Sequence, residues 1–224
     1  MGKEEEMYDF ILASGSPRRK ELLERTGWRV MLRPVILEEN LFAGESPQAY
    51  AERLALEKAE NAISEDNMFV LGADTIVISG NRILGKPENE EDALDILREL
   101  QGKMHKVLTA IALVDPFIER TSVETCETYV PMRAYNEQEM EDYIASGSPL
   151  DKAGAYGIQD EKFHPVDVDS LVGCYANVMG LPLCHLTNMM REFGGKTPPA
   201  VPERCIAYTN YNCHVYKEIL QRVT

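Results

Sequence analysis

Apolar positions follow two alternating spacings along the chain, which predicts an α/β protein. Short runs that are continuously apolar, or that alternate apolar with polar residues, are typical of strands. Between them, apolar residues recur three or four positions apart, which is typical of helices packed by one face. We expect strands at residues 8–13, 28–36, 69–79, 82–84, 105–114 and 121–133, and helices at 17–26, 47–62, 90–100, 137–145 and 182–193.

Capping residues mark the ends of several predicted helices. Ser16 followed by Pro17 is a strong N-cap and first-turn pair, and Gly27 is placed to close the same helix. Asn136 with Glu139 three residues later predicts a capping box. The local signals therefore agree with the period of the apolar pattern.

The length and apolar content predict one core. A chain of 224 residues with 44% hydrophobic residues can form one domain, with room for two lobes around a cleft. We expect this domain to span residues 1–193. Residues 160–170 are acidic and predict a loop. After Gly194 and Gly195, a Pro-rich link leads to residues 205–224, which predict a short amphipathic helix or an extended tail, so residues 194–224 are expected to form a C-terminal extension.

Composition argues against several kinds of partner and site. A formal net charge of −14 disfavours binding to a nucleic-acid polymer, which needs a basic surface. No apolar run approaches the roughly 20 residues that span a bilayer, and the charged stretch Met1–Met7 does not resemble a signal peptide. Five cysteines, without a CxxC pair, argue against a disulfide framework or a structural zinc site. We therefore expect a reduced, cytoplasmic protein that binds no membrane.

Residues 14–20 combine features of an anion-binding loop. Small residues, Ser14 among them, let a ligand approach the backbone, and the helix that begins after Ser16 offers free N–H groups to phosphate. Arg18 and Arg19 lie in its first turn, where they oppose the helix dipole unless an anion is bound. A solvated basic turn is the alternative, and the small residues favour the phosphate site.

Two acidic residues are candidates for catalysis and metal binding. Asp74 interrupts an apolar strand, where an acid is costly to bury unless it is paired, hydrogen-bonded or bound to a metal. Glu39 lies just past another predicted strand. Two such carboxylates suit Mg²⁺ or Mn²⁺, which also engage substrate phosphates. The alternatives are a carboxylate that caps neighbouring N–H groups at Asp74 and a solvated acid at Glu39.

Further polar candidates lie on three other segments. Lys58 lies among alanines and leucines of the second helix, and Lys86 follows the predicted hairpin, although each alone is compatible with a surface lysine. Lys152 and Gln159 flank a stretch of small residues that indicates tight packing or close approach of a ligand. Gln159 could bind a base edge or satisfy backbone groups. No Ser-His-Asp arrangement, P-loop or GxGxxG stands out, which argues against serine catalysis and hydride transfer.

Five motifs follow one another along the chain: LASGSPRRKELL at 12–23, LGADTIV at 71–77, LGKP at 84–87, DKAGAYGIQ at 151–159 and NVMGLPL at 177–183. Taken together and in this order, they resemble the Maf family of nucleoside triphosphate pyrophosphatases. The resemblance covers roughly residues 9–190 and is far more specific than one short pattern.

The resemblance implies a fold and an activity. The fold is an elongated mixed β-sheet with flanking helices and two lobes around a central nucleotide cleft, often as a homodimer. The activity is metal-dependent hydrolysis of the α–β phosphoanhydride of a nucleoside triphosphate, which releases a nucleoside monophosphate and pyrophosphate.

The resemblance also implies roles for individual residues. Arginines and a serine would hold the triphosphate, carboxylates would manage the metal and the attacking water, and lysines would neutralise phosphate charge. By motif, Ser14, Arg18 and Arg19 bind the phosphates, Glu39 and Asp74 hold Mg²⁺ or Mn²⁺ with Asp74 as general base, Lys58 and Lys86 assist catalysis, Lys152 extends the cationic path, and Gln159 lies near the base.

Within the family, the motif around Asp74 resembles the branch that acts on dTTP, UTP and modified pyrimidine triphosphates. The branch that prefers 7-methyl-GTP is one alternative, and residues 160–172 depart from the usual family pattern beside Gln159. A nucleotide-binding regulator of cell division or septum formation, with little turnover, is the alternative from another class of protein.

Overall fold

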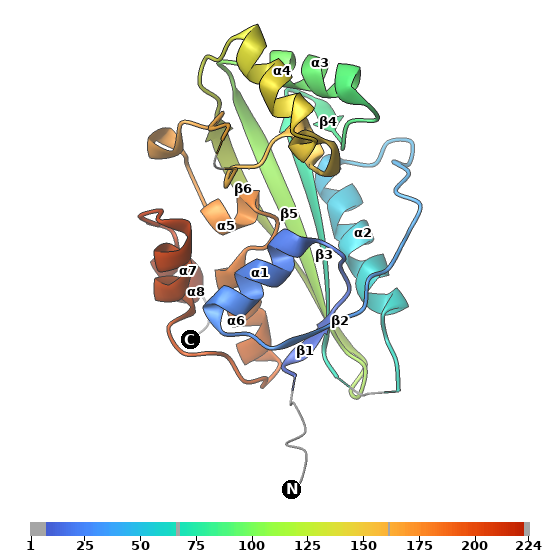
Figure 1. The fold of residues 1–224 in the computed structure, drawn as a ribbon. Coiled ribbons are helices and arrows are strands. Elements are labelled where there is room, and N and C mark those ends of the chain that lie inside the picture. Colours follow the sequence, from blue (N-terminus) through green and yellow to red (C-terminus); the bar gives the residue numbers. More distant parts are fainter. Residues whose placement is uncertain (1–7, 66–67, 161, 222–224) are drawn as a thin grey trace, which may run out of the picture.

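The computed structural model describes residues 8–65, 68–160 and 162–221, so the charged stretch Met1–Met7 lies outside the described residues. Six strands form one mixed sheet with the order β2-β1-β3-β5-β6, and β4 pairs with β3 (Figure 1). β1 is parallel to β2 and β3, and the remaining pairs are antiparallel. The strands are β1 (Phe10–Leu12), β2 (Val30–Leu32), β3 (Val70–Ser79), β4 (Arg82–Leu84), β5 (Met104–Asp115) and β6 (Arg120–Pro131). The predicted α/β class and mixed sheet are confirmed.

Helices cover both faces of the sheet, and their predicted caps are present. Ser16 accepts from the Arg19 N–H, Gly27 closes α1 in the left-handed region, and Asn136 forms a capping box with Glu139. None of the helices in the described part of the chain has the length and apolar character needed to cross a membrane. The α-helices are α1 (Pro17–Thr26), α2 (Pro47–Asn61), α3 (Glu90–Leu100), α4 (Glu137–Ala145), α5 (Tyr175–Val178), α6 (Leu183–Glu192), α7 (Val201–Thr209) and α8 (Tyr216–Gln221); single 3-10 turns are η1 (Ser148–Asp151), η2 (Ala153–Ala155) and η3 (Val168–Ser170).

Alternation along the strands creates two separate cores. In β1, Ile11 points to the core under α2, whereas Phe10 and Leu12 point to the core under α1, α3, α4 and α6. Figure 1 shows α3, α4 and β4 gathered at one end of the long strands and α1, α6 and β1 at the other. These groups form the two expected lobes.

The sheet has a gap along one edge of β3. β5 pairs with the other edge of β3 from Val70 to Ile78, so β1 and β4 share the remaining edge. β1 covers that edge as far as Leu71, and β4 covers it from Val77 to Ser79. Residues 72–76 therefore face neither strand, and Asp74 lies in the middle of this opening.

The segments at 28–36 and 160–170 differ from what their sequence predicts. The strand expected at 28–36 covers only Val30–Leu32, because its partner β1 ends at Leu12, and the last pairing bond runs from Arg33 N to Leu12 O (3.0 Å). The chain then runs as a loop over residues 33–45, which we call the Glu39 loop. The predicted acidic loop at 160–170, described except for residue 161, contains the single turn η3.

Residues 194–221 pack against the domain. They contain α7 and α8, and α7 begins at Val201, before the expected start at 205. Val201 and Ile219 are buried, and Asn188 Nδ2 of α6 donates to Ile219 O (2.6 Å). α7 lies beside α1 (Figure 1). This segment also brings Cys205 and Cys213 to a small cavity lined by Cys174 and Cys184, a gathering of thiols that sequence spacing did not indicate.

Candidate active site

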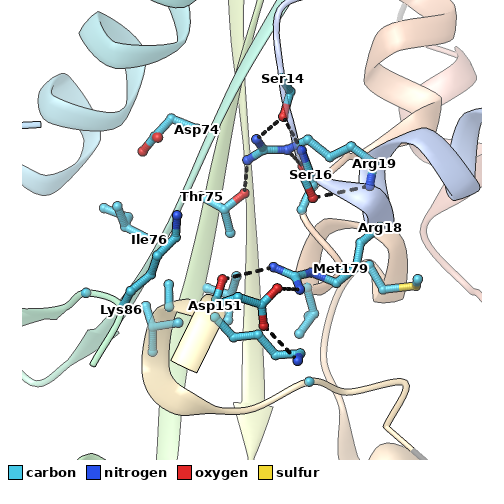
Figure 2. Close-up of a pocket in the computed structure, with 18 of the residues that line it drawn as sticks. Ser14, Ser16, Arg18, Arg19, Asp74, Thr75, Ile76, Lys86, Asp151 and Met179 are labelled. Atoms are coloured by element: carbon cyan, nitrogen blue, oxygen red, sulfur yellow. Dashed lines mark hydrogen bonds and ion pairs between the residues drawn. The ribbon is translucent and has the colours of Figure 1, made fainter. Parts of the chain in front are cut away.

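A cavity of about 470 Å³ opens at the gap in the sheet. Its walls come from the end of β1, the start of α1, β3, the turn after β4, and the segments around 151–159 and 178–180 (Figure 2). Five cationic side chains and three carboxylates line it, in a chain whose formal net charge is −14. The cavity is thus a local excess of positive charge in an acidic protein. The charged residues are Arg18, Arg19, Lys58, Lys86, Lys152, Glu39, Asp74 and Asp151.

Asp74 meets helix α2 because Gly72 lets that helix approach β3 closely. A Cβ on Gly72 would lie 2.0 Å from the Ala55 carbonyl oxygen, so no larger residue fits. Asp74 shares this face of β3, two residues further on. Its Oδ1 lies 2.6 Å from the Nζ of Lys58, which is 8% exposed, and the same ammonium lies 2.6 Å from Glu39 Oε1. Lys58 therefore bridges two carboxylates across the cavity wall.

The Glu39 loop is fixed by side chains of α2. Tyr50 donates from its hydroxyl to Glu39 O (2.9 Å), and Arg53 donates to Asn40 O (2.9 Å) and forms an ion pair with Glu45 (2.7 Å). Burial, together with the charges of Asp74 and Glu39, raises the pKa of Tyr50. The hydroxyl therefore stays protonated and continues to hold the loop.

The electrostatics of the cavity keep Glu39 ionised. Burial by itself raises the pKa of Glu39, but the hydrogen bond from Lys58 and the positive charges of Lys58, Lys86 and Arg19 outweigh it. The pKa of Glu39 is therefore lowered from its ordinary value. The carboxylate is available as a ligand for a cation.

The first turn of α1 presents Arg19 to the other face of β3. Its guanidinium donates to Ser14 Oγ (3.0 Å), Thr75 Oγ1 (3.0 Å) and Gly180 O (2.8 Å). Figure 2 shows Thr75 pointing toward Arg19 and Asp74 pointing away from it, as alternation along β3 requires. Burial lowers the pKa of Arg19, although the charge of Asp74 opposes this shift.

Arg18 is paired with a carboxylate on the opposite wall. Its Nη1 lies 2.8 Å from Asp151 Oδ2 (Figure 2). Asp151 Oδ1 lies 3.0 Å from Lys152 Nζ, and that ammonium also binds the Ser148 hydroxyl (2.9 Å) and lies 3.7 Å from Asp160. Lys152 thus lines the cavity as predicted, but its ammonium is bound by Asp151 and Ser148.

Lys86 and Gln159 lie on the remaining sides of the cavity. Lys86 is exposed after β4 and extends into the cavity in Figure 2. Gln159 Nε2 lies 3.5 Å from Asp160 Oδ1, and its buried Oε1 has no hydrogen-bond partner among the described residues. A buried acceptor without a donor costs about 1–3 kcal/mol, which a ligand donor would recover.

All of the residues predicted from sequence line this one cavity, although they come from six distant segments. Sequence reasoning missed three that hold them in place: Thr75 beside Arg19, Asp151 beside Arg18, and Tyr50 behind the Glu39 loop. Thr75 and Asp151 lie inside motifs already recognised. Tyr50 left no signal, because an aromatic residue at helical spacing is typical of the core.

Comparison with known proteins agrees with the recognised motifs. A family model described as "Maf-like protein" matches residues 9–193. A protein of Syntrophomonas wolfei named dTTP/UTP pyrophosphatase is 42% identical over 184 residues, which cover 82% of this chain and 96% of that protein. A protein of Koribacter versatilis with the same name is 43% identical over 82% of this chain and 94% of its own length. A solved structure from Mycobacterium abscessus, described as a nucleoside-triphosphatase / dITP/XTP pyrophosphatase, covers 82% of this chain and 96% of its own, with 15% identity and a TM-score of 0.38.

Proposed function

Because the chain belongs to the Maf family, we propose that it hydrolyses nucleoside triphosphates at the α–β phosphoanhydride, with release of a nucleoside monophosphate and pyrophosphate. The observation that carries this proposal is the position of Asp74. Its carboxylate lies in the same cavity as the cationic N-terminus of α1, where a triphosphate would bind. Water attack on a phosphate needs mainly positioning and electrostatic stabilisation, which this cavity provides.

The cationic side chains bind the triphosphate in this proposal. Arg18 exchanges its partner Asp151 for phosphate oxygens, and Arg19 with Ser14, at the positive N-terminal end of α1, binds the same triphosphate. Lys86 extends from the opposite wall and neutralises charge on the leaving pyrophosphate. Lys152, whose ammonium binds Ser148 and Asp151, orients the acid that faces Arg18.

Asp74 is the proposed general base. It pairs with Lys58 through Oδ1, so we assign Oδ2 to the attacking water, whose proton it accepts. Lys58 and Glu39 fix the carboxylate in this orientation. The phosphoanhydride oxygen leaves with pyrophosphate, and the water oxygen remains on the monophosphate.

A divalent ion fits the donors of this site. Glu39 and Asp74 supply two carboxylates, and Mg²⁺ or Mn²⁺ is commonly held by one or two carboxylates together with substrate phosphates. When bound, the ion would neutralise charge on the triphosphate. Within the described residues no group of three or more histidine, cysteine or acidic side chains is placed to hold a metal, so the substrate itself is needed to complete the site.

The base is proposed to be a pyrimidine with an N–H at position 3. The relatives are named for dTTP and UTP. The unpaired Oε1 of Gln159 is an acceptor, and thymine and uracil present an N3–H donor that cytosine lacks. This chemistry favours dTTP and UTP over CTP.

We also propose that the enzyme acts in the cytoplasm and forms homodimers. The five cysteines are free thiols, which fits a reducing compartment that also holds the substrates. The dimer is supported by the family resemblance and by the position of β6 at the edge of the sheet. Size-exclusion chromatography with light scattering measures the mass, and a monomer at micromolar concentration would contradict the dimer.

A nucleotide panel tests the proposed activity. Purified protein is incubated with dTTP, UTP, CTP, GTP and 7-methyl-GTP, with Mg²⁺ or Mn²⁺, and pyrophosphate is measured separately from orthophosphate. Pyrophosphate from dTTP and UTP is the expected product. Orthophosphate alone would indicate a phosphatase, preference for 7-methyl-GTP would place the protein in the other branch, and silence across the panel would favour a binding protein without turnover.

Asp74→Asn tests the assignment of the base. The variant keeps the shape of the side chain but cannot accept the proton, so kcat should fall at least about 100-fold. Binding of dTTP, measured by calorimetry, should remain. Asp115→Asn, at the end of the neighbouring strand β5, is the matched control. Wild-type turnover in Asp74→Asn would show that another group is the base.

A further inference from the structure

Two acceptors of Arg19 are joined to each other by a buried threonine outside the cavity. Thr109 lies on β5 with 0% of its surface exposed and does not belong to the cavity lining in the described part of the chain. Its Oγ1 lies 2.9 Å from Thr75 Oγ1 and 3.1 Å from the carbonyl oxygen of Asn177. Thr75 accepts from Arg19, and Asn177 begins the turn that ends at Gly180, the other acceptor.

The direction of each hydrogen bond in this group is determined. A guanidinium only donates, so Thr75 Oγ1 accepts from Arg19. A carbonyl only accepts, so the Thr109 hydroxyl donates to Asn177 O. The single hydroxyl hydrogen of Thr75 is then directed to Thr109 Oγ1. The hydroxyls of Thr75 and Thr109 therefore each have one defined orientation.

The group closes into a ring. Gly180 N donates to the same Asn177 O (2.9 Å), and Gly180 O accepts from Arg19 Nε (2.8 Å). The ring thus runs from Arg19 through Thr75, Thr109 and Asn177 to Gly180 and back to Arg19 (Figure 2 shows the bond from Arg19 to Thr75). Thr109 is the member that connects β3 to the 177–180 turn.

We propose that Thr109 is a positioning residue for hydrolysis, because it fixes two of the three acceptors that orient the guanidinium of Arg19. The proposal rests on the proposed function, in which Arg19 binds phosphate. The neighbours of Thr109 on the same face of β5, Val107 and Ile111, are aliphatic, so its hydroxyl is a polar group within an apolar stretch of the core. Valine has the shape of threonine without the hydroxyl, so it removes the ring bond and keeps the volume.

Three variants test this role. Thr109→Val should lower kcat/KM for dTTP about tenfold, because a small misplacement of a binding group has a large effect on a reaction that depends on positioning. Thr109→Ser retains the hydroxyl and should stay within about threefold of wild type. Thr187→Val removes an equally buried hydroxyl that bonds only within α6 among the described residues, and it should leave kcat/KM unchanged. Unchanged kinetics in Thr109→Val, or an equal loss in Thr109→Ser, would overturn the proposal.

A double-mutant cycle separates the ring from general packing. Thr75→Val already breaks the link from Thr109 to Arg19 through Thr75, and only the bond from Thr109 to Asn177 O then remains. Adding Thr109→Val to Thr75→Val should therefore lower kcat/KM by less than it does in the wild-type background. Additive losses would overturn the proposal, because they would mean that Thr109 acts through packing.

Calorimetry with inorganic pyrophosphate keeps this test separate from the test of the proposed function. Thr109→Val should bind pyrophosphate about tenfold more weakly than wild type, by the same loss of positioning. Equal binding would overturn the role of Thr109. Failure of the wild-type protein to release pyrophosphate from any nucleotide would instead overturn the proposed activity, and the binding comparison would still decide the role of the ring.

Discussion

His105 makes the stability of the protein depend on pH. It lies on β5 with 3% of its surface exposed, and its Nε2 is 2.7 Å from the hydroxyl of Tyr156 in the cavity wall. Burial lowers the pKa of His105 to about 4. The folded state therefore holds this imidazole neutral where the unfolded chain, with an ordinary pKa near 6.5, binds a proton.

The sign of the pH effect follows from this difference. Above pH 6.5 both states are neutral and the full stability is present, whereas below it the unfolded state gains a proton first. Between pH 7 and pH 5 this linkage should lower the free energy of unfolding by about 2 kcal/mol. Urea titrations of wild type and His105→Gln at both pH values measure it. An equal pH dependence in the two proteins would show that His105 is not the source.

Individual site residues differed in how well sequence could predict them. Asp74 was predictable because an acid within an apolar strand needs a partner, whereas Lys58 alone is compatible with a surface lysine and became a candidate through the family resemblance. The pairing of Lys58 with Glu39 was not, because it depends on the path of a loop. Thr109 lies in a stretch of β5 that is buried on both faces, and only the packed structure shows what its hydroxyl contacts.

At the scale of elements, the Glu39 loop depends on α2 for its position. The guanidinium of Arg53 stacks over the ring of Phe42 at 4.0 Å and pairs with Glu45 at the base of the loop. Arg53→Met should free the loop and lower kcat/KM about tenfold, because Glu39 then spends less time beside Lys58. Steady-state kinetics with dTTP measure the effect.

A second substitution tests a contact between α2 and the Glu39 loop without breaking the ion pair of Arg53 with Glu45. Tyr50→Phe removes only the hydroxyl that donates to Glu39 O, and it should lower kcat/KM by about threefold, since one hydrogen bond is lost. Arg82→Met breaks the more exposed pair with Glu99, outside the cavity lining, and serves as the control. Wild-type kinetics in Arg53→Met would mean that the loop holds Glu39 without help from α2.

Most elements could be predicted because local signals and the apolar period agreed, as in α1, where Ser16 and Gly27 mark both ends. The β2 strand was predicted too long because its apolar pattern continues to Ile36, whereas its partner β1 ends at Leu12. The gap in the sheet was not predictable from any single element. The gap arises because β1 ends at Leu12, opposite Leu71 of β3, whereas β4 pairs with β3 only from Val77 onward. The five residues of β3 that pair with neither strand become apparent only when the strands are paired.

At the scale of the molecule, the family match and the folded unit do not end together. The match stops at Phe193, yet α7 and α8 contribute Val201 and Ile219 to buried contacts with the domain. Residues 194–221 therefore cover apolar surface of α1 and α6 that would otherwise face solvent. We propose that this segment stabilises the domain and takes no part in catalysis, since none of its residues lines the active-site cavity.

Ile219→Ala tests this proposal. Ile219 is 8% exposed, and loss of a buried isoleucine side chain typically costs about 2–5 kcal/mol, which lowers Tm by about 4–20 °C in a protein of this size. Activity toward dTTP at 25 °C should stay within about twofold of wild type, because the changed side chain is remote from the cavity. Ile118→Ala makes the same change at a position that is 56% exposed, and it should leave Tm nearly unchanged. If Ile219→Ala has the same Tm as wild type, residues 194–221 do not stabilise the domain. If the variant keeps the wild-type Tm but loses activity, this segment has a part in turnover.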